Sequence, residues 1–165
     1  MKCKEIMKRK VLTLYPEDSL IRAVRMFSKK GISGAPVVDE EGRLLGVLSE
    51  TDLLREIYKI GRRYRVVFPS SHLLGLSVEG GSMEEGREIR EELKRVRVDE
   101  VMTEKVYSVS AEDDVELALE IMVSKGVNRV PVIEGGRVVG LITRKEVLRM
   151  LEEGFMKEEK EGDGE

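Results

Sequence analysis

Two segments of the chain carry a hydroxyl side chain followed three positions later by a carboxylate: Ser49 with Asp52, and Thr143 with Glu146. Each pair follows a short apolar run and precedes a helical pattern, so it stands where a strand gives way to a helix. One interpretation is a capping box, which stabilises the helix start by about 0.5–2 kcal/mol. The other is a ligand site, in which the hydroxyl and the helix N-terminus bind a phosphate while the carboxylate accepts hydrogen bonds from both ribose hydroxyls. The spacing alone favours the cap, and Glu146 suits a cap better than Asp52 does, because glutamate is the usual third-position partner.

The charged neighbours of the two pairs differ in sign. The second pair is accompanied by Arg144, Lys145 and Arg129, whose cations suit phosphate oxygens through charge-assisted hydrogen bonds. Solvated surface is an equally good interpretation of Arg129 and Arg144. The first pair has Glu50 as its neighbour, and this carboxylate would repel a polyphosphate. The sequence therefore predicts two inequivalent sites, of which only the second favours phosphates.

The chain repeats itself with a shift of about 95 residues, which lays Met7 on Met102 and Pro36-Val37 on Pro131-Val132. The physical pattern repeats as well, because each half has an apolar stripe at helical spacing followed by two runs rich in Val, Leu and Ile. The stripes consist of Leu20, Ala23, Val24 and Phe27 in the first half, and of Val115, Ala118, Leu119 and Met122 in the second.

Each half is expected to fold in the order strand, helix, strand, strand, helix. The first helix of each half should begin near a cap, Asp18 or Asp113, and end at a glycine, Gly31 or Gly126. One such unit cannot cover both faces of its sheet, so the predicted fold class is α/β (mixed α+β), with two pseudo-symmetric β-α-β-β-α repeats packed sheet to sheet. The expected strands are 11–14, 35–38 and 44–48, then 106–109, 130–133 and 138–142, and the second helices lie near 52–57 and 146–151.

Three segments in each half resemble the cystathionine-β-synthase (CBS) domain family: 11–14, 31–38 and 46–52, with their counterparts 106–109, 126–133 and 140–146. The resemblance covers roughly residues 1–58 and 98–152. It implies a stand-alone regulatory module that binds AMP, ADP, ATP or S-adenosylmethionine in clefts between the repeats. The cleft beside Glu50 would suit a ligand of low negative charge, such as AMP or S-adenosylmethionine.

In this family, adenosyl ligands are held by the first strand, by the segment before the proline and by the hydroxyl–carboxylate junction. By resemblance, Thr13, Ser108, Ile32 and Val127 would face the adenine ring, and plain β structure is the alternative for them. The full set of binding residues that the resemblance implies is Thr13, Ile32, Ser33, Ala35, Pro36, Ser49, Asp52, Ser108, Val127, Asn128, Arg129, Pro131, Thr143, Arg144 and Glu146. It also implies a homodimer in which four repeats form a flat disc, and we expect exposed apolar positions at Ile6, Val101 and the second helices to favour it.

Four segments organise the chain: repeat 1 (1–58), a connector (59–97), repeat 2 (98–152) and an acidic tail (153–165). The connector carries an apolar stripe that predicts one docked helix, made of Ile89, Leu93 and Val96. The tail is acidic and dotted with glycine, so it is expected to be disordered.

Composition and motifs narrow the function classes. A net charge of −3 gives no reason to expect a nucleic-acid or membrane partner, and the single cysteine, Cys3, fits a reducing, cytoplasmic compartment. The lone His72 reads as a loop residue, so no metal site is expected. Because no phosphate loop or nucleophile–base pair is present, the chain is not expected to be an enzyme. Two alternatives to a nucleotide sensor stay open: a ligand-free dimerisation and interaction scaffold, and a nucleic-acid-binding accessory protein that uses Arg62 to Arg65.

Overall fold

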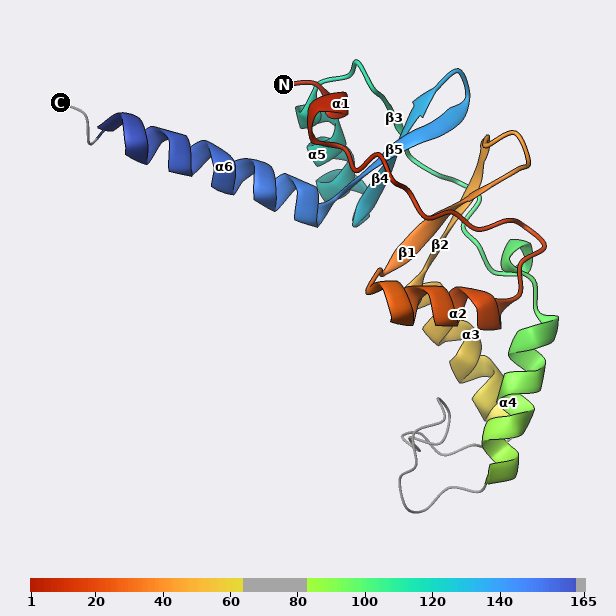
Figure 1. The fold of residues 1–165 in the computed structure, drawn as a ribbon. Coiled ribbons are helices and arrows are strands. Elements are labelled where there is room, and N and C mark those ends of the chain that lie inside the picture. The colour runs from red at the N-terminus through yellow and green to blue at the C-terminus, as the bar shows by residue number, and fades with distance from the viewer. Residues whose placement is uncertain (64–82, 163–165) are drawn as a thin grey trace. The chain divides into compact units, whose positions relative to one another are not determined.

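The computed structural model describes residues 1–63 and 83–162, and the fold is a mixed α/β one with two small sheets (Figure 1). The chain divides into two compact units. The α2/α3 unit comprises Thr13–Glu40 and Leu45–Lys105, and the α5/α6 unit comprises Met1–Leu12, Glu41–Leu44 and Val106–Glu165. Each unit thus combines one repeat with the segment that leads into the other repeat. Among the described residues, no helix is both long enough and apolar enough to cross a membrane.

In chain order, the elements of the α2/α3 unit are α2 (Leu20–Lys30), β1 (Gly34–Val38), β2 (Leu44–Ser49), α3 (Glu50–Arg63), α4 (Met83–Arg95) and a short 3-10 helix (Val98–Glu100). Strands β1 and β2 form a two-stranded sheet. The segment 11–14, predicted to be a strand, contributes only a parallel bridge between Leu14 and Val37. The elements of this repeat therefore follow one another in the predicted order, but the predicted first strand is reduced to this single bridge.

The elements of the α5/α6 unit are α1 (Cys3–Ile6), β3 (Val109–Ser110), α5 (Val115–Lys125), β4 (Arg129–Glu134), β5 (Arg137–Thr143) and α6 (Arg144–Gly162). Strand β3 runs parallel to β4, which is antiparallel to β5. Helix α6 continues well beyond the predicted 146–151 and includes residues for which the sequence predicts disorder. Glu and Lys are good helix formers, and one glycine inside a helix costs only about 1 kcal/mol, so the segment can extend an existing helix. Residues 163–165 of the predicted tail lie outside the described residues.

The caps of α2 and α5 lie one residue later than predicted. Ser19 caps α2 and Asp114 is the N-cap residue of α5. Asp18 and Asp113 instead accept hydrogen bonds from the amide three residues before them, at 2.8 and 2.7 Å. The two aspartates thus close the turn that leads into each helix. Both helices end at the predicted glycines, which adopt the left-handed conformation.

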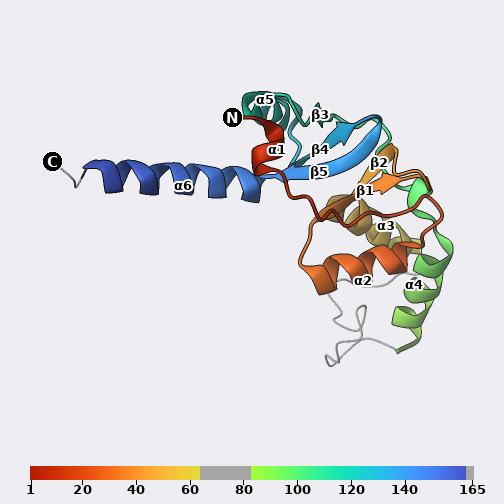
Figure 2. The ribbon, with the colours of Figure 1, turned by 45° about the horizontal axis from the view of Figure 1, so that its top comes forward.

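The connector helix α4 is part of the hydrophobic core of the α2/α3 unit. Ile89 and Leu93 are buried, and Val96 packs against the same cluster, which includes Leu20 and Ile60. The Val96 carbonyl also accepts a hydrogen bond from Leu20 N at 3.0 Å. Both views show α4 beside α2 and α3 (Figures 1 and 2). The connector therefore supplies the apolar surface that covers these two helices.

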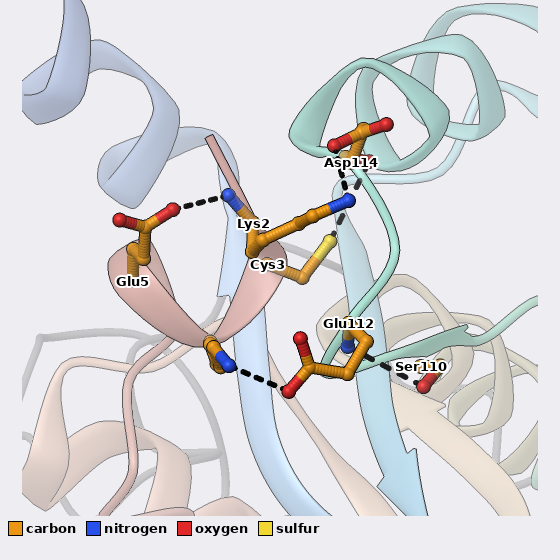
Figure 3. A network of polar contacts seen from close by, with 7 residues as sticks. Lys2, Cys3, Glu5, Ser110, Glu112 and Asp114 are labelled. Atoms are coloured by element: carbon orange, nitrogen blue, oxygen red, sulfur yellow. Dashed lines mark hydrogen bonds and ion pairs between the residues drawn. The ribbon is translucent and has the colours of Figure 1, made fainter.

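The first residues of the chain are fastened to the turn before α5 by a polar network (Figure 3). Lys2 Nζ lies 2.8 Å from Asp114 Oδ1, and Lys4 Nζ lies 2.6 Å from Glu112 Oε1. Between them Cys3 is fully buried, with its thiol 3.6 Å from the Asp114 carbonyl oxygen. Burial raises the pKa of the Cys3 thiol, and the carboxylates of the adjacent turn add to this. Cys3 therefore serves as a small core residue here.

Two positions expected to be exposed for dimerisation are covered. Ile6 is 7% exposed, within the core of the α5/α6 unit, and Val101 packs against the core of the α2/α3 unit. The expectation was wrong for Ile6 and Val101, because each leading segment folds back onto the other repeat. The second helices do keep exposed apolar side chains, notably Leu54, Tyr58 and Leu148.

A methionine from each leading segment packs onto a glycine of the adjacent strand. Met7 contacts Gly140 in β5, and Met102 contacts Gly46 in β2. The three atoms nearest to a β-carbon added at Gly140 all belong to the Met7 side chain. One added at Gly46 would lie 2.6 Å from Met102 Sδ and 2.9 Å from the backbone oxygen of Thr103. Side chains can move aside more cheaply than a paired backbone can.

Gly46→Ala is therefore expected to lower the free energy of unfolding by about 1–3 kcal/mol, and by more than Gly140→Ala does. Thr103 cannot withdraw easily, because its N–H and carbonyl both pair with Val47, at 2.9 and 3.0 Å. Urea titrations of the two variants beside the wild type measure the difference. Equal destabilisation by the two alanines would contradict the role given to the Thr103 backbone.

Candidate functional site

The junction between β2 and α3, hereafter the α3 junction, contains a complete reciprocal cap. Asp52 Oδ2 accepts hydrogen bonds from Ser49 N at 2.9 Å and from Ser49 Oγ at 2.7 Å, while Ser49 Oγ accepts one from Asp52 N at 3.2 Å. Asp52 is one of two charged residues buried in the described part of the chain, at 8% exposed. The other oxygen, Oδ1, accepts a hydrogen bond from Arg55 Nη1 at 3.2 Å. The cap interpretation is thus correct geometrically, and it holds the carboxylate in one orientation.

The junction between β5 and α6, hereafter the α6 junction, has the same design with a longer acid. Glu146 Oε2 accepts hydrogen bonds from Thr143 N at 3.0 Å and from Thr143 Oγ1, and Glu146 is 7% exposed. Thr143 Oγ1 accepts a hydrogen bond from Lys145 N at 3.2 Å. Within the described ranges, no side chain pairs with Glu146 Oε1. The arginine at the position equivalent to Arg55, Arg149, points instead to Glu153, with Nε 3.8 Å from Oε1.

The segments before Pro36 and Pro131, which the resemblance includes in the ligand sites, lie against the α3 junction and the α6 junction. The Ser33 carbonyl accepts a hydrogen bond from Glu50 N at 2.9 Å, and the Asn128 carbonyl accepts one from Arg144 N at 3.4 Å. The Asn128 side-chain oxygen also accepts a hydrogen bond from Arg144 Nη2. Glu50 and Arg144 therefore occupy the same structural position with opposite charge, and both are exposed.

The first strand positions also correspond between the units. Leu14 pairs in parallel with Val37, and Val109 pairs in parallel with Val132. Thr13 and Ser108 directly precede the paired residues, Thr13 partly exposed and Ser108 exposed. In each unit, the predicted first-strand residue, Thr13 or Ser108, therefore lies next to the sheet whose last strand leads into that unit's junction.

The remaining residues of the predicted binding set differ in how deeply they are buried. Ile32 and Val127 are partly buried against the cores, and Arg129 is partly exposed. The side chains buried in the cores belong to Ala35, Pro36 and Pro131. These three residues can reach a ligand only through their backbone, and the Pro36 carbonyl already accepts a hydrogen bond from Leu14 N at 2.9 Å.

Sequence reasoning missed Arg55. Its signal was present, because a cation three residues after a carboxylate on a helix lies on the same face. The same spacing occurs for Arg149 after Glu146, however, where no such pair forms, so the spacing alone does not decide the contact.

The described residues include no metal-binding cluster and only part of the basic cluster Arg62 to Arg65. They contain no group of three or more His, Cys, Asp or Glu side chains placed to hold a metal ion. In the basic cluster, Arg62 lies over the Tyr58 ring, 6.0 Å from its centroid, and Arg63 forms an ion pair with Glu92 at 2.6 Å. Arg65 and His72 lie outside the described residues.

Comparison with known proteins agrees with the repeat. The CBS domain family matches residues 3–59 and 98–153. This chain belongs to the CBS domain family. An uncharacterized protein of Methanocaldococcus jannaschii, MJ1426, is 31% identical over 154 residues, which cover 92% of this chain and 91% of that protein. Inosine-5′-monophosphate dehydrogenase of the same organism is 26% identical over 149 residues, 90% of this chain but 23% of the enzyme. Relatives thus include a CBS protein of similar length and an enzyme that carries the CBS pair as one part.

Solved structures share the fold of this CBS chain. The CBS domain pair of protein MJ0100, solved in complex with 5′-methylthioadenosine and S-adenosyl-L-methionine, has a TM-score of 0.66 at 19% identity and covers 93% of this chain and 98% of that one. CBSX2, solved in complex with AMP, has a TM-score of 0.66 at 20% identity and covers 92% of this chain and 96% of that one. At these identities the likeness establishes the CBS fold.

Proposed function

We propose that this CBS protein is a regulatory module, without catalytic activity of its own, that binds adenosyl nucleotides at the two junctions. The observation that carries the proposal is the pair of buried carboxylates, Asp52 and Glu146, each fixed by a hydroxyl and a backbone amide at the start of a helix. Such a carboxylate is oriented to accept hydrogen bonds from ribose hydroxyls, and the helix N-terminus beside it favours an anionic group. Adenosyl ligands in complexes of similar fold support the same ligand class.

The two sites are proposed to differ in the ligand charge that they prefer. Glu50 stands beside the α3 junction where Arg144, followed by Lys145, stands beside the α6 junction. A polyphosphate would be repelled at the first position and attracted at the second. The α3 junction therefore suits a ligand of low negative charge, such as AMP or S-adenosylmethionine, and the α6 junction suits ADP or ATP.

Ligand binding would act by shifting a conformational equilibrium of a homodimer. Exposed Leu54 and Tyr58 on α3, and Leu148 and Leu151 on α6, provide apolar surface for a second copy. A ligand that binds one arrangement of the repeats more tightly would favour that arrangement and alter how a partner protein docks.

A thermal-shift panel tests the proposed ligand class. AMP, ADP, ATP, S-adenosylmethionine and 5′-methylthioadenosine are each added to the wild-type protein, with GTP as the control for the base. A ligand at 100 times its dissociation constant is expected to add about 2.7 kcal/mol of stability, so at least one adenosyl compound should raise Tm while GTP does not. If every adenosyl compound leaves Tm unchanged, the junctions are caps alone and the protein is a ligand-free scaffold.

The scaffold is the second candidate, since both caps are made by the chain's own residues. A nucleic-acid-binding role is less well supported, because Arg63 is neutralised by Glu92. A salt-sensitive Tm increase with RNA in the same panel would favour that role.

A further inference from the structure

The acceptor capacity of Asp52 is largely used within the protein itself. A carboxylate offers about four lone-pair sites. Ser49 N and Ser49 Oγ take two of them on Oδ2, and Arg55 Nη1 takes one on Oδ1. A ribose that presents two hydroxyls to Asp52 therefore needs a site that Arg55 occupies.

The α6 junction offers a matched comparison. Glu146 also accepts two hydrogen bonds from its hydroxyl residue, but the equivalent arginine, Arg149, pairs with Glu153. Among the described residues, none occupies Glu146 Oε1. The two junctions thus differ at one carboxylate oxygen, Asp52 Oδ1 against Glu146 Oε1, although an arginine follows three residues later in both.

The residue one turn further along each helix explains the difference. Arg149 meets a carboxylate there, Glu153, at the favourable i, i+4 spacing. The equivalent residue in α3 is Lys59, a like charge that forms its own ion pair with Glu56 at 3.4 Å. Arg55 is repelled from that end of the helix and turns back to Asp52.

We infer that Arg55 holds the ribose acceptor of the α3 junction in the ligand-free protein and lowers the affinity of that junction by competing with the ligand. This inference rests on the proposed function. Arg55 is a positioning residue that acts through Asp52, and its side chain is 61% exposed, so it can swing into solvent when a ribose arrives. The α3 junction therefore binds its ligand only at a higher ligand concentration than it would if Arg55 did not compete for Asp52.

Arg55→Met keeps the aliphatic stem and removes the donors. The matched control is Arg149→Met in α6. Adenosine is the probe, because it is uncharged and the loss of a cation does not change its attraction to the site. Exposed ion pairs are weak, so Arg55→Met is expected to tighten adenosine binding about two- to fivefold by calorimetry, and Arg149→Met to leave it unchanged. Because the gain arises at the ribose acceptor, it should vanish with 2′,3′-dideoxyadenosine and when Asp52→Asn is added to Arg55→Met.

Three results would overturn the inference: unchanged or weaker adenosine binding by Arg55→Met, an equal gain by Arg149→Met, or a gain that persists with the dideoxy analogue. Each of them still leaves adenosine bound to the wild-type protein, so the proposed function stands. If neither the wild type nor Arg55→Met binds adenosine or any nucleotide of the thermal-shift panel, the proposed function itself fails, and the inference falls with it.

Discussion

Asp52→Ala is expected to abolish binding of low-charge adenosyl ligands at the α3 junction while ADP or ATP still binds at the α6 junction. The carboxylate is buried and oriented by Ser49, so its loss removes both proposed ribose hydrogen bonds at once. Hydrogen bonds to a charged group contribute about 1.5–3 kcal/mol each. Two of them correspond to a loss of affinity of roughly 100-fold or more.

The same substitution also removes a helix cap. Ser49 N and Ser49 Oγ lose their acceptor, so Asp52→Ala should lower the free energy of unfolding by about 0.5–2 kcal/mol. That cost leaves the chain folded at ordinary temperature if its stability lies in the usual range of about 5–15 kcal/mol. Binding and stability can therefore be measured on the same variant.

Glu146→Ala is the mirror variant, because it disrupts the equivalent cap of the other unit. Calorimetry with 5′-methylthioadenosine and with ATP on both variants should give opposite losses. Asp52→Ala with the stoichiometry and affinities of the wild type for both ligands would refute the assignment of the α3 junction. Equal losses of both ligands in both variants would refute the difference in charge preference.

Ile89→Ala is expected to destabilise the α2/α3 unit by about 2–5 kcal/mol, although the residue belongs to a connector that has no counterpart in the repeat. Ile89 is fully buried among the side chains of α2, α3 and the 3-10 helix, so alanine would leave a cavity in the core. A urea titration measures the loss, and hydrogen exchange locates it in the α2/α3 unit.

Arg90→Ala is the control, since Arg90 is the exposed neighbour on the same helix and surface substitutions usually change stability by less than about 0.5 kcal/mol. If Ile89→Ala is as mild as Arg90→Ala, then α4 is not part of the core in solution. In that case the connector would be a linker that leaves α2 and α3 uncovered.

Local physics made much of the CBS fold predictable. The stripes of α2 and α5 recur at helical spacing, and their terminal glycines adopt the left-handed conformation that ends a helix. The two hydroxyl–carboxylate junctions follow from spacing alone, and both form the cap that is one of the two interpretations of that spacing. The connector stripe of Ile89 and Leu93 likewise indicated a docked helix, because an apolar face must be covered.

The rest depends on contacts between residues far apart in the sequence. Ile6 is covered because residues 1–12 fold onto the second repeat, and no local pattern encodes that exchange. The pair of Arg55 with Asp52 is local, but the same spacing recurs at Arg149 and Glu146 without the contact, so the spacing does not distinguish the two. The long α6 differs from the expected tail because a helix already started costs little to extend.

Nuclear magnetic resonance of the labelled wild-type protein, titrated with AMP and with ATP, tests the central proposal most directly. We expect the largest amide shifts at Ser49–Asp52 and Thr143–Glu146, whose backbone N–H groups belong to the two junctions. AMP should perturb the first group at lower concentration than ATP does, and ATP should perturb the second more strongly. Saturating ligand that leaves both groups of amides unshifted would contradict nucleotide binding at these junctions.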